Sequence, residues 1–542
     1  MTVWTGTHRL VRLALRRDRV LLPIWIVSFS AVLAGIISTE TSLYRDAAQR
    51  AAAATFGAAD VMTRVTDGPA SGTSIGAMSI VESYVVFAIF IALMSGLAVV
   101  RHTRLDEETG LAELIGSSVV GRHARLTAAL IVAVLANVVI ALGATIVLVA
   151  YGLPASGAAA AALSFAGVGL AFASVAAVTA QVSVTQRGAN GLVGFAVGVA
   201  FLLRCFGDAL GTVAPSGVEL ISAWPSWLSP IGWGQQIRPF DQNNWAIGVL
   251  FVGLSVLLIG VAYRLSTQRD LGAGLMRERL GPAAASPGLL SPWGLAWRLQ
   301  RGPLLAWTCG MFVAGASIGG VSSTAGDLAD QSPQFAQMLQ DRYPGADFVD
   351  LFAAVFMSIL GVVAAGYTIQ AVLRLRAEEA SGRLEPVLAT SVDRGRWMAS
   401  HGVIAAIGTI VVIGAMGVGA TLGYVVAGGD LGGGMGQTAA ALVQLPPVLA
   451  LGAFAVAAFA LAPRWAPAIA WAALAASLVA GQFGEMLKFP QAALDLSPFT
   501  HVPLVPAEPF DAVPLCILLV AAIAFAAVGV LAFRRRNLAI AA

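Results

Sequence analysis

The sequence predicts an all-α integral membrane protein with about twelve transmembrane helices, arranged as two tandem six-span halves that form a pseudo-dimer. Composition is the first reason: 58% of the 542 residues are hydrophobic and 11% are charged, against roughly 25% charged residues in soluble domains. Apolar runs of roughly 18 residues or more, each able to cross a hydrocarbon core of ~30 Å, recur about twelve times. Finally, motifs of the first half return in the same order in the second half.

The apolar runs place six spans in each half. Those of the first half are expected near 20–40, 78–101, 124–151, 158–183, 190–210 and 246–265. Those of the second half are expected near 303–323, 350–373, 398–427, 437–462, 465–483 and 512–533. The expected domains are a first six-span half at 1–265, a cytoplasmic linker rich in Pro, Gly and Ala at 266–290, and a second six-span half at 291–542.

The basic residues predict the orientation of the spans. Cytoplasmic segments of membrane proteins carry an excess of Lys and Arg, and an N-terminus in the cytoplasm puts 25 of the 32 basic residues on that side. We therefore expect a multi-pass protein of the cytoplasmic (inner) membrane with both termini in the cytoplasm. The arginine-rich N-terminus resembles a signal peptide, but no small-residue cleavage site follows it, which favours a retained first span.

A helix lying in the membrane interface is predicted before the first span. Four arginines are spaced to share one face of it: Arg9, Arg12, Arg16 and Arg19. Basic amphipathic helices of this kind suit the inner interface. Ser291 and Pro292 are suited to begin the matching helix of the second half, with Ser as N-cap and Pro at the first helical position. A plain basic flank is the alternative.

The first cytoplasmic loop of each half carries the same acidic phrase. We call RLDEETGLAELIGSSVVGR, at 104–122, the first acidic loop, and RAEEASGRLEPVLATSVDR, at 376–394, the second acidic loop. They are identical at Arg104/Arg376, Glu107/Glu379, Gly110/Gly382, Glu113/Glu385, Val120/Val392 and Arg122/Arg394. Helical spacing would put Asp106, Gly110, Glu113 and Ser117 on one face. Surface loops diverge after duplication unless something binds them, so a docking helix is favoured over a solvated loop helix.

Further motifs repeat in the same order. Phe206-Gly207-Asp208 matches Phe483-Gly484-Glu485, and Leu-Ser-Pro at 228–230 matches Leu-Ser-Pro at 496–498. Matches in one order over the whole length indicate a tandem duplication with the two halves in parallel orientation. Glycine permits close backbone approach, and the glutamates are able to accept charge-assisted hydrogen bonds from a partner's arginines.

The phrase E-E-x-[ST]-G-x-x-E after the second span resembles the coupling-helix region of type-2 ABC exporter permeases. With the duplicated halves and the segment SPIGWGQQIRPF at 229–240, the whole chain resembles the fused actinobacterial permeases that export polyketide antibiotics or multiple drugs. The resemblance implies the transmembrane subunit of an ATP-driven exporter that moves amphipathic drugs, antibiotics or lipid-like molecules outward. The second half departs from the pattern at Pro386 and in its last loop, SPFTHVPLVPAEPF.

The same resemblance implies that two copies of an ABC ATP-binding subunit dock on the two acidic loops. The docking residues would be Asp106, Glu107, Gly110, Glu113, Glu378, Glu379, Gly382 and Glu385. A P-loop needs GxxxxGK[ST], and the only lysine, Lys488, lies in MLKFP. The chain is therefore predicted to be a permease and not itself an enzyme, with no cofactor of its own and with ATP and Mg on the partner subunit.

Other site chemistry is sparse in the sequence. No two of the five histidines have metal-ligand spacing, and Cys205, Cys309 and Cys516 suggest neither a disulfide nor a metal site. A formal charge of +3 is too small to indicate a nucleic-acid partner. The expected partners are membrane lipids and a hydrophobic small-molecule substrate, whose identity the sequence does not specify.

Charges near the outer ends of the spans suggest either a structural ion pair or an outer gate. Arg204 and Asp208 are four residues apart and face one side of a helix, while Glu485 is the counterpart of Asp208. The polar stretch 211–244 that follows the first pair suits either a short re-entrant hairpin or an external loop with an aromatic belt.

Aromatic residues on three spans predict a substrate path, with helix packing or lipid contact as the alternative for each. They are Tyr84, Phe87 and Phe90 on the second span, Phe195 and Phe201 on the fifth, and Phe352, Phe356 and Met357 on the eighth. Such faces suit large apolar ligands, and the resembling family has its transport path between the second and fifth spans.

A proton-coupled secondary multidrug transporter with six-plus-six spans is the main alternative. Carriers of the major facilitator type have a Gly-x-x-x-Asp-Arg/Lys-x-Gly motif in the loop where this chain has its acidic phrase. They also usually need a proton- or ion-carrying acid deep in a span, and the only deep candidates, Asp208 and Glu485, are peripheral. A membrane sensor or scaffold would explain docking loops but not the aromatic faces.

Overall fold

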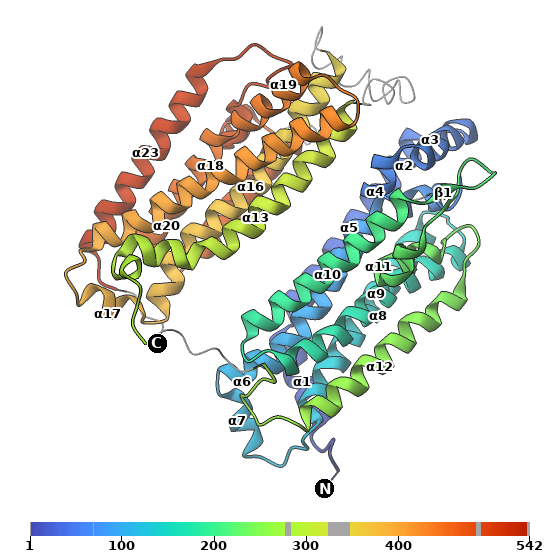
Figure 1. Ribbon diagram of the computed structural model, residues 1–542, viewed down its shortest axis with the longest axis horizontal. Helices are drawn as coiled ribbons and strands as arrows, with labels where there is room; N and C mark the ends of the chain where they lie inside the picture. Colours follow the sequence, from blue (N-terminus) through green and yellow to red (C-terminus); the bar gives the residue numbers. More distant parts are fainter. Residues whose placement is uncertain (1, 69, 277–282, 324–346, 484–488, 539–542) are drawn as a thin grey trace. The chain divides into compact units, whose positions relative to one another are not determined.

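The chain forms two helical units, Met1–Leu280 and Gly281–Ala542, seen in the computed structural model of Figure 1. The structure describes residues 2–68, 70–276, 283–323, 347–483 and 489–538. Within these residues, eleven helices are long and apolar enough to cross a membrane. The prediction of an all-α integral membrane protein is therefore confirmed.

The first unit is a bundle of six long helices with short elements at both ends. Its helices are α1 (Thr7–Arg17), α2 (Leu21–Leu43), α3 (Ala47–Ala59), α4 (Val61–Thr66), α5 (Ile75–Val100), α6 (Asp106–Glu108), α7 (Leu111–Gly116), α8 (Ala124–Ala150), α9 (Ala155–Val182), α10 (Gln186–Ala209), α11 (Pro230–Gln236) and α12 (Gly248–Ser266). A π-helical turn, Arg101–Leu105, joins α5 to α6, and two-residue strands β1 (Thr212–Val213) and β2 (Leu220–Ile221) pair antiparallel.

Helix α9 lies at the centre of the first unit. It packs against α5, α8, α10, α11 and α12. Its sequence, ASGAAAAALSFAGVGLAFASVAAVTAQV, is dominated by Ala and Gly, and small residues let helix backbones approach closely in membranes. The start of the linker belongs to this unit, because Leu275 N donates to Gln181 O over 3.2 Å and Met276 N donates to Val182 O over 3.0 Å.

The second unit repeats this plan with differences. Its helices are α13 (Pro292–Ser323), α16 (Phe348–Ala380), α17 (Leu384–Leu388), α18 (Arg394–Val426), α19 (Leu431–Leu442), α20 (Leu445–Leu461), α21 (Ala466–Leu478), α22 (Gln491–Leu494) and α23 (Ala512–Arg535). Helices α13 and α18 pack backbone to backbone. A Cβ on Gly315 or Gly319 would overlap α18 carbonyls, and one on Gly419 or Gly423 would overlap α13 carbonyls.

Most predicted spans match observed helices within a few residues. The interfacial segment of the second half is not a separate helix: Ser291 caps it as expected, but α13 runs on through Pro303. The span expected at 437–462 corresponds to the candidate span Leu431–Leu461, within which a short turn separates α19 from α20. The span expected at 465–483 is the shorter apolar helix Ala466–Gly481, close to residues outside the described part.

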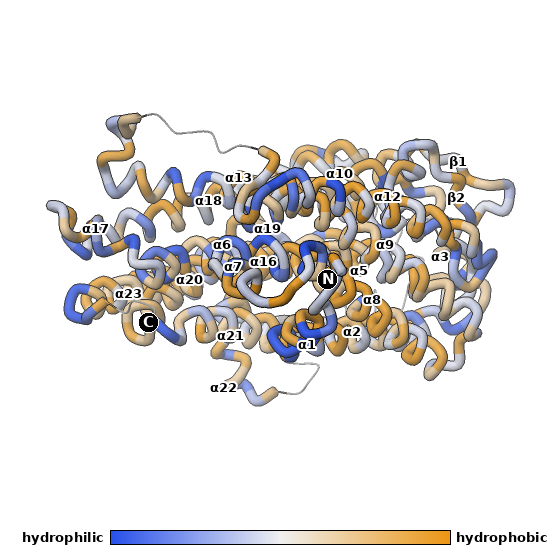
Figure 2. Tube along the Cα trace, turned by 90° about the horizontal axis from the view of Figure 1, so that it is seen from below, coloured by the Kyte–Doolittle hydropathy of each residue, from blue (hydrophilic) through white to orange (hydrophobic). Residues whose placement is uncertain are grey.

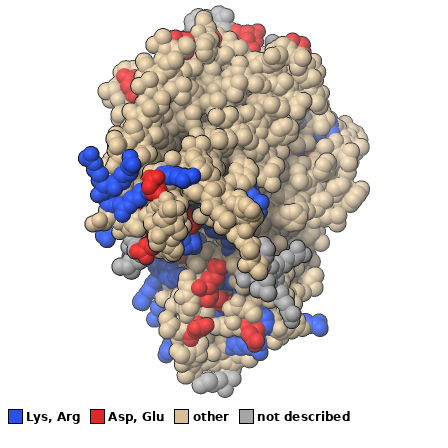
Figure 3. Space-filling model, turned by 60° about the vertical axis from the view of Figure 1, so that its left-hand side comes forward, with Lys and Arg blue, Asp and Glu red and all other residues tan. Residues whose placement is uncertain are grey.

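Charged residues gather at the helix ends. In Figure 2 the tube of α1 is largely hydrophilic, whereas α5 and α8 are mostly hydrophobic. Figure 3 shows basic side chains grouped with acidic ones, while most of the surface in that view carries no charge. Large exposed apolar side chains such as Ile146, Val249 and Ile523 lie along the long helices, as lipid-facing positions require.

Candidate functional site

The two acidic loops have the same backbone conformation. In the first, Gly110 N donates to Glu107 O over 3.2 Å and Gly110 has φ +73°. In the second, Gly382 N donates to Glu379 O over 3.1 Å and Gly382 has φ +72°. A short helix follows each glycine, α7 after Gly110 and α17 after Gly382. The repeated phrase therefore encodes a repeated turn and helix.

This turn explains the glycines and corrects one expectation about the loop. Both glycines adopt a left-handed φ that other residues rarely adopt, and a Cβ on either would meet no atom of this chain within 4 Å. The same turn interrupts the helix, so that Asp106 in α6 and Glu113 in α7 belong to different helices. The single face predicted for Asp106, Gly110, Glu113 and Ser117 does not form.

The first acids of the first loop are held by arginines of the same unit. Asp106 Oδ1 lies 2.7 Å from Arg17 Nη1 on α1. Glu107 receives the buried Arg104 at 2.8 Å and Arg269 at 2.8 Å, with Arg125 at 3.8 Å. The Glu107 side chain is 4% exposed, so its charge is satisfied within the chain.

The first acids of the second loop are held in the same way. Glu378 Oε1 lies 2.9 Å from Arg374 Nε, and its Oε2 lies 2.8 Å from Arg383 Nε. Glu379 binds Arg536, beyond the end of α23, at 2.6 Å, and its side chain has no exposed surface. In each unit the second carboxylate of the motif is thus tied to a basic residue that follows the sixth span.

The outer turn of each loop is different, because its acid is exposed. Glu113 on α7 and Glu385 on α17 both face solvent, as does Leu114, which is 73% exposed. Of the eight residues predicted to dock a partner, the four acids Asp106, Glu107, Glu378 and Glu379 are already paired inside the chain. The two glycines shape the turns, and Glu113 and Glu385 are the carboxylates that a partner would reach.

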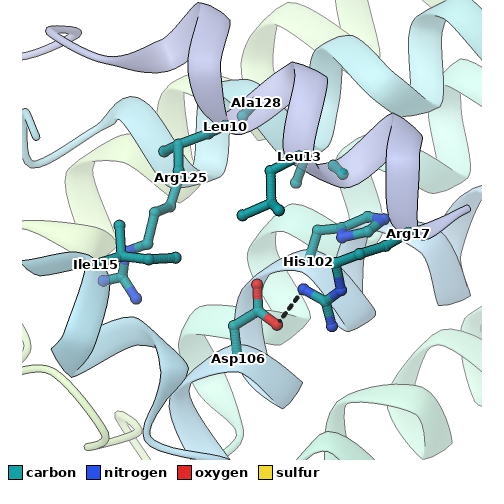
Figure 4. A pocket seen from close by; sticks show the side chains of 10 residues that line it. Leu10, Leu13, Arg17, His102, Asp106, Ile115, Arg125 and Ala128 are labelled. Carbon is teal, nitrogen blue, oxygen red and sulfur yellow. Dashed lines mark hydrogen bonds and ion pairs between the residues drawn. The ribbon is translucent and has the colours of Figure 1, made fainter.

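Helix α1 supports the first acidic loop from behind. Figure 4 shows Leu10 and Leu13 of α1 and Ile115 of α7 pointing into one small cavity of about 20 Å³, with the Arg17–Asp106 pair beside it. Backbone bonds add to this contact, since Gly121 N donates to Thr5 O over 2.9 Å. The N-terminal segment therefore contacts α7 by packing, α6 through the Arg17–Asp106 pair and the residues after α7 through a backbone hydrogen bond.

Asp18, between α1 and α2, connects this part of the chain to the residues that follow α5. Its carboxylate lies 2.6 Å from Arg101 Nη1 and 2.7 Å from His102 Nε2. Burial opposes ionisation of this group, but the hydrogen bond and charge of His102, together with Arg101, outweigh it and hold the pKa of the Asp18 carboxyl below its usual range.

Arg204 and Asp208 form a buried ion pair within α10 that joins this helix to neighbouring segments. Arg204 Nε lies 2.8 Å from Asp208 Oδ2, and neither side chain has exposed surface. Arg204 also donates to the carbonyls of Arg64 and Val65, over 3.0 and 2.5 Å, and Asp208 accepts from Ser222 over 2.6 Å. The structural alternative fits these contacts better than a gate. Glu485 lies outside the described residues.

The stretch 211–244 folds back into the bundle. Ser229 caps α11 by accepting from Gly232 N, and Ile231, Gly232 and Gly234 of α11 are buried. The helix is held from two sides, because Tyr84 Oη donates to Ile231 O over 2.7 Å and Ser164 Oγ donates to Gly234 O over 2.9 Å. A re-entrant hairpin describes this segment better than an external loop.

The predicted aromatic path is divided between core and surface. Tyr84 and Phe87 are buried and pack with Phe29 and Phe165 of α2 and α9. Phe90 is 50% exposed and Phe195 is 71% exposed, while Phe201 is partly buried. In the second unit Phe352 and Met357 are buried, and the ring of Phe356 lies 4.4 Å from that of Phe352.

Comparisons with known proteins identify the kind of membrane protein. The family described as "Multidrug efflux system permease Rv1217c, C-terminal domain" matches residues 289–534. Over 537 residues the chain is 39% identical to the multidrug efflux system permease protein Rv1217c of Mycobacterium tuberculosis, covering 98% of this chain and 95% of that protein. The chain belongs to the Rv1217c family of multidrug efflux permeases. Membership of this family accounts for both units, since the similarity runs through the first half as well.

This chain is therefore a transport permease, and charged residues within its spans are candidates for a role in transport. Two acids within the spans were not among the predicted site residues, Glu40 in α2 and Glu82 in α5. Glu40 is buried, and its Oε2 has no hydrogen-bond partner. The available signal was an acid inside an otherwise apolar helix, which is costly in a membrane. Among the described residues, no group of three or more His, Cys, Asp or Glu is placed to hold a metal ion.

Proposed function

We propose that this chain is the transmembrane subunit of an ATP-driven ABC exporter of the cytoplasmic membrane. It would move amphipathic drugs, antibiotics or lipid-like molecules outward, with ATP and Mg bound by a separate subunit. The observation that carries the proposal is the repeated turn, which presents Glu113 and Glu385 to solvent from the same backbone frame. Two equivalent surfaces suit two copies of one partner.

The surroundings of each docking helix fit the transmission of force. Helix α7 follows α6 at Gly110, and α6 is joined to α5 through the π-turn, to α1 through Arg17, and to the segment after α12 through Arg269. Helix α17 follows α16 after Gly382, and the end of α16 is joined through Glu379 to Arg536, after α23. A partner that moved either short helix would therefore move several spans of that unit together.

The surfaces available to substrate are apolar. Phe90 of α5 and Phe195 of α10 are exposed aromatic side chains on two helices that pack against each other. Aromatic surface binds large apolar molecules with few directional demands, as efflux of varied compounds requires. The buried rings of Tyr84 and Phe87 would pack beneath this face in the core.

The test combines complex formation with coupled transport. The chain is co-expressed with a candidate ABC ATP-binding subunit from the same genome, purified as a complex and assayed in lipid for ATP hydrolysis and drug transport. We expect one permease to bind two ATPase subunits, and Glu113→Ala with Glu385→Ala to lose drug-stimulated hydrolysis. Glu108→Ala is the matched control, because Glu108 is exposed in the same loop but has Ala380 at the repeated position. Unchanged stimulation in the double variant would refute docking through these acids.

A proton-coupled carrier is the second candidate, and Glu40 is the observation that favours it. A buried carboxyl whose Oε2 lacks a hydrogen-bond partner, inside a membrane-spanning helix, is suited to bind and release a proton. Transport that stops when the proton gradient is collapsed, continues without ATP and is lost in Glu40→Gln would establish this mechanism. ATP-dependent transport that survives collapse of the gradient would exclude it.

A further inference from the structure

A polar cavity of about 360 Å³ lies beside the first acidic loop, at the arginine-rich ends of α8, α9 and α12. Small-molecule sites have volumes of roughly 300–1,000 Å³, so the cavity has the size of a ligand site. Its charged and amide-bearing lining residues are Glu107, Arg122, Arg125, Gln181, Arg269 and Asp270. None of them belongs to the outer turn proposed to dock the ATPase.

The charges around this cavity do not balance. Three arginines line it, Arg122, Arg125 and Arg269, against two carboxylates, Glu107 and Asp270. Behind Glu107 lies a further arginine, Arg104, which has no exposed surface and shares the same carboxylate at 2.8 Å. Two further acids act on these arginines, Asp106 on Arg125 and Glu108 on Arg104, so the excess is the one positive charge of the lining itself. Partly buried positive charge in excess of its partners favours the binding of an anion.

One buried hydrogen-bond donor of the arginine cluster also lacks an acceptor. Arg125 Nη1 is buried and has no hydrogen-bond partner, because the nearest carboxylate oxygen, Oε1 of Glu107, lies 3.8 Å away. Glu107 cannot move closer to it without leaving Arg269, to which it is bound through both oxygens. An unmade hydrogen bond at a buried charged group is costly, and the Arg125 side chain, which is 19% exposed, would turn to present this group to an anion in the cavity.

Two apolar residues also line the cavity. Leu271, which follows α12, is 48% exposed, whereas Leu126 on α8 is buried. Val256 and Leu257, further along α12, are 66% and 63% exposed on a helix long and apolar enough to span the bilayer. A ligand with a phosphate and an acyl chain would place the first among the arginines and the second along this surface.

We propose that this cavity binds the phosphate head group of an anionic phospholipid from the leaflet at the arginine-rich ends of the spans. Arg122 and Arg125 would contact the phosphate, and Gln181 would add an amide donor at the floor. Bound lipid would complete the arginine cluster around Glu107 and so stiffen the first acidic loop. The site stands whether or not the chain works with an ATPase, because none of its residues depends on that partner.

Native mass spectrometry of the purified full-length protein tests the site. The probes are dioleoyl phosphatidylglycerol, dioleoyl phosphatidylcholine and inorganic phosphate. We expect one phosphatidylglycerol to bind more tightly than the others, and Arg125→Gln and Arg122→Gln each to weaken it about tenfold, the loss of one charge-assisted contact. Arg122 is exposed at the rim, so its variant keeps the test valid if Arg125→Gln fails to fold.

The control is Arg264→Gln, since Arg264 is an exposed arginine near the same end of α12 and is not among the residues lining the cavity. Unchanged phosphatidylglycerol binding in this control supports the site. An equal loss in the control would show general attraction to a basic surface and overturn the proposal. Inorganic phosphate binding as tightly as phosphatidylglycerol, or phosphatidylcholine binding equally well, would overturn the assignment to an anionic lipid.

Discussion

Arg269 and Glu107 form a two-pronged ion pair, with Nη2 2.8 Å from Oε1 and Nη1 2.9 Å from Oε2. Arg536 and Glu379 repeat it in the second unit, at 2.6 and 2.8 Å. Each pair joins the residues that follow the sixth span to the acidic loop after the second span. Paired hydrogen bonds between a guanidinium and a carboxylate fix orientation as well as distance, so both loops are held rigidly against their units.

Removal of Arg536 is expected to destabilise the second unit. Arg536→Ala would leave the buried Glu379 carboxylate without its closest partner, and breaking a buried pair from one side costs about 3–5 kcal/mol. Thermal unfolding of the purified protein measures the loss. Arg535→Ala, which removes the exposed neighbour, should leave the Tm unchanged. Equal Tm values for the two variants would show that the pair contributes little.

Alanine at the two repeated glycines is expected to strain both loops alike. Gly110→Ala and Gly382→Ala each force a side chain into a left-handed backbone, at about 1–2 kcal/mol. No steric clash adds to this, since a Cβ at either position meets no atom within 4 Å. Gly116→Ala, equally open but without a positive φ, should leave stability unchanged or slightly raised. The Tm of the three variants decides the matter, and a loss in Gly116→Ala as large as the others would contradict the argument.

Loss of the Asp18 charge is expected to matter only above acidic pH. The pKa of the Asp18 carboxyl is lowered in the folded protein, so its contribution to stability is present above the unfolded value of about 3.9 and is lost as the pH falls through the folded pKa. Asp18→Asn should therefore lower the Tm at pH 7, and the difference from the parent should shrink below about pH 4. A difference that stays constant from pH 7 to pH 3 would rule out a charge effect.

Arg204 is expected not to tolerate lysine. Its guanidinium reaches Asp208 and the carbonyls of Arg64 and Val65 at once, and a single ammonium group cannot satisfy all three directions. Arg204→Lys should reduce the yield of monodisperse protein several-fold, because buried acceptors are left unpaired. Arg187→Lys, at an exposed position near the start of the same helix, serves as the control. Wild-type yield and Tm for Arg204→Lys would show that the network is dispensable.

The sequence determined the local structure of this protein. Apolar runs fixed the long helices, since a bilayer leaves a backbone no other way to satisfy its hydrogen bonds. The repeated phrase supplies glycine at both turns, Gly110 and Gly382, and glycine is the residue that most readily adopts the positive φ found there. Ser291 was likewise predicted as a cap from its own neighbours. The separate interfacial helix expected to begin at Ser291 did not form, because α13 continues through Pro303.

Tertiary structure decided which charges are free. Glu107 and Glu113 lie six residues apart in one acidic phrase, and nothing in that phrase says that the first is enclosed by arginines while the second faces solvent. The difference comes from Arg269 and Arg536, which lie 162 and 157 residues from the carboxylates they bind. Those contacts exist because the sixth span of each unit ends beside the second, a result of how the helices pack. Exposure and charge pairing therefore depend on packing between segments that are distant in the sequence. This packing leaves Glu113 and Glu385 exposed in the acidic loops and gathers arginines around the cavity beside the first loop.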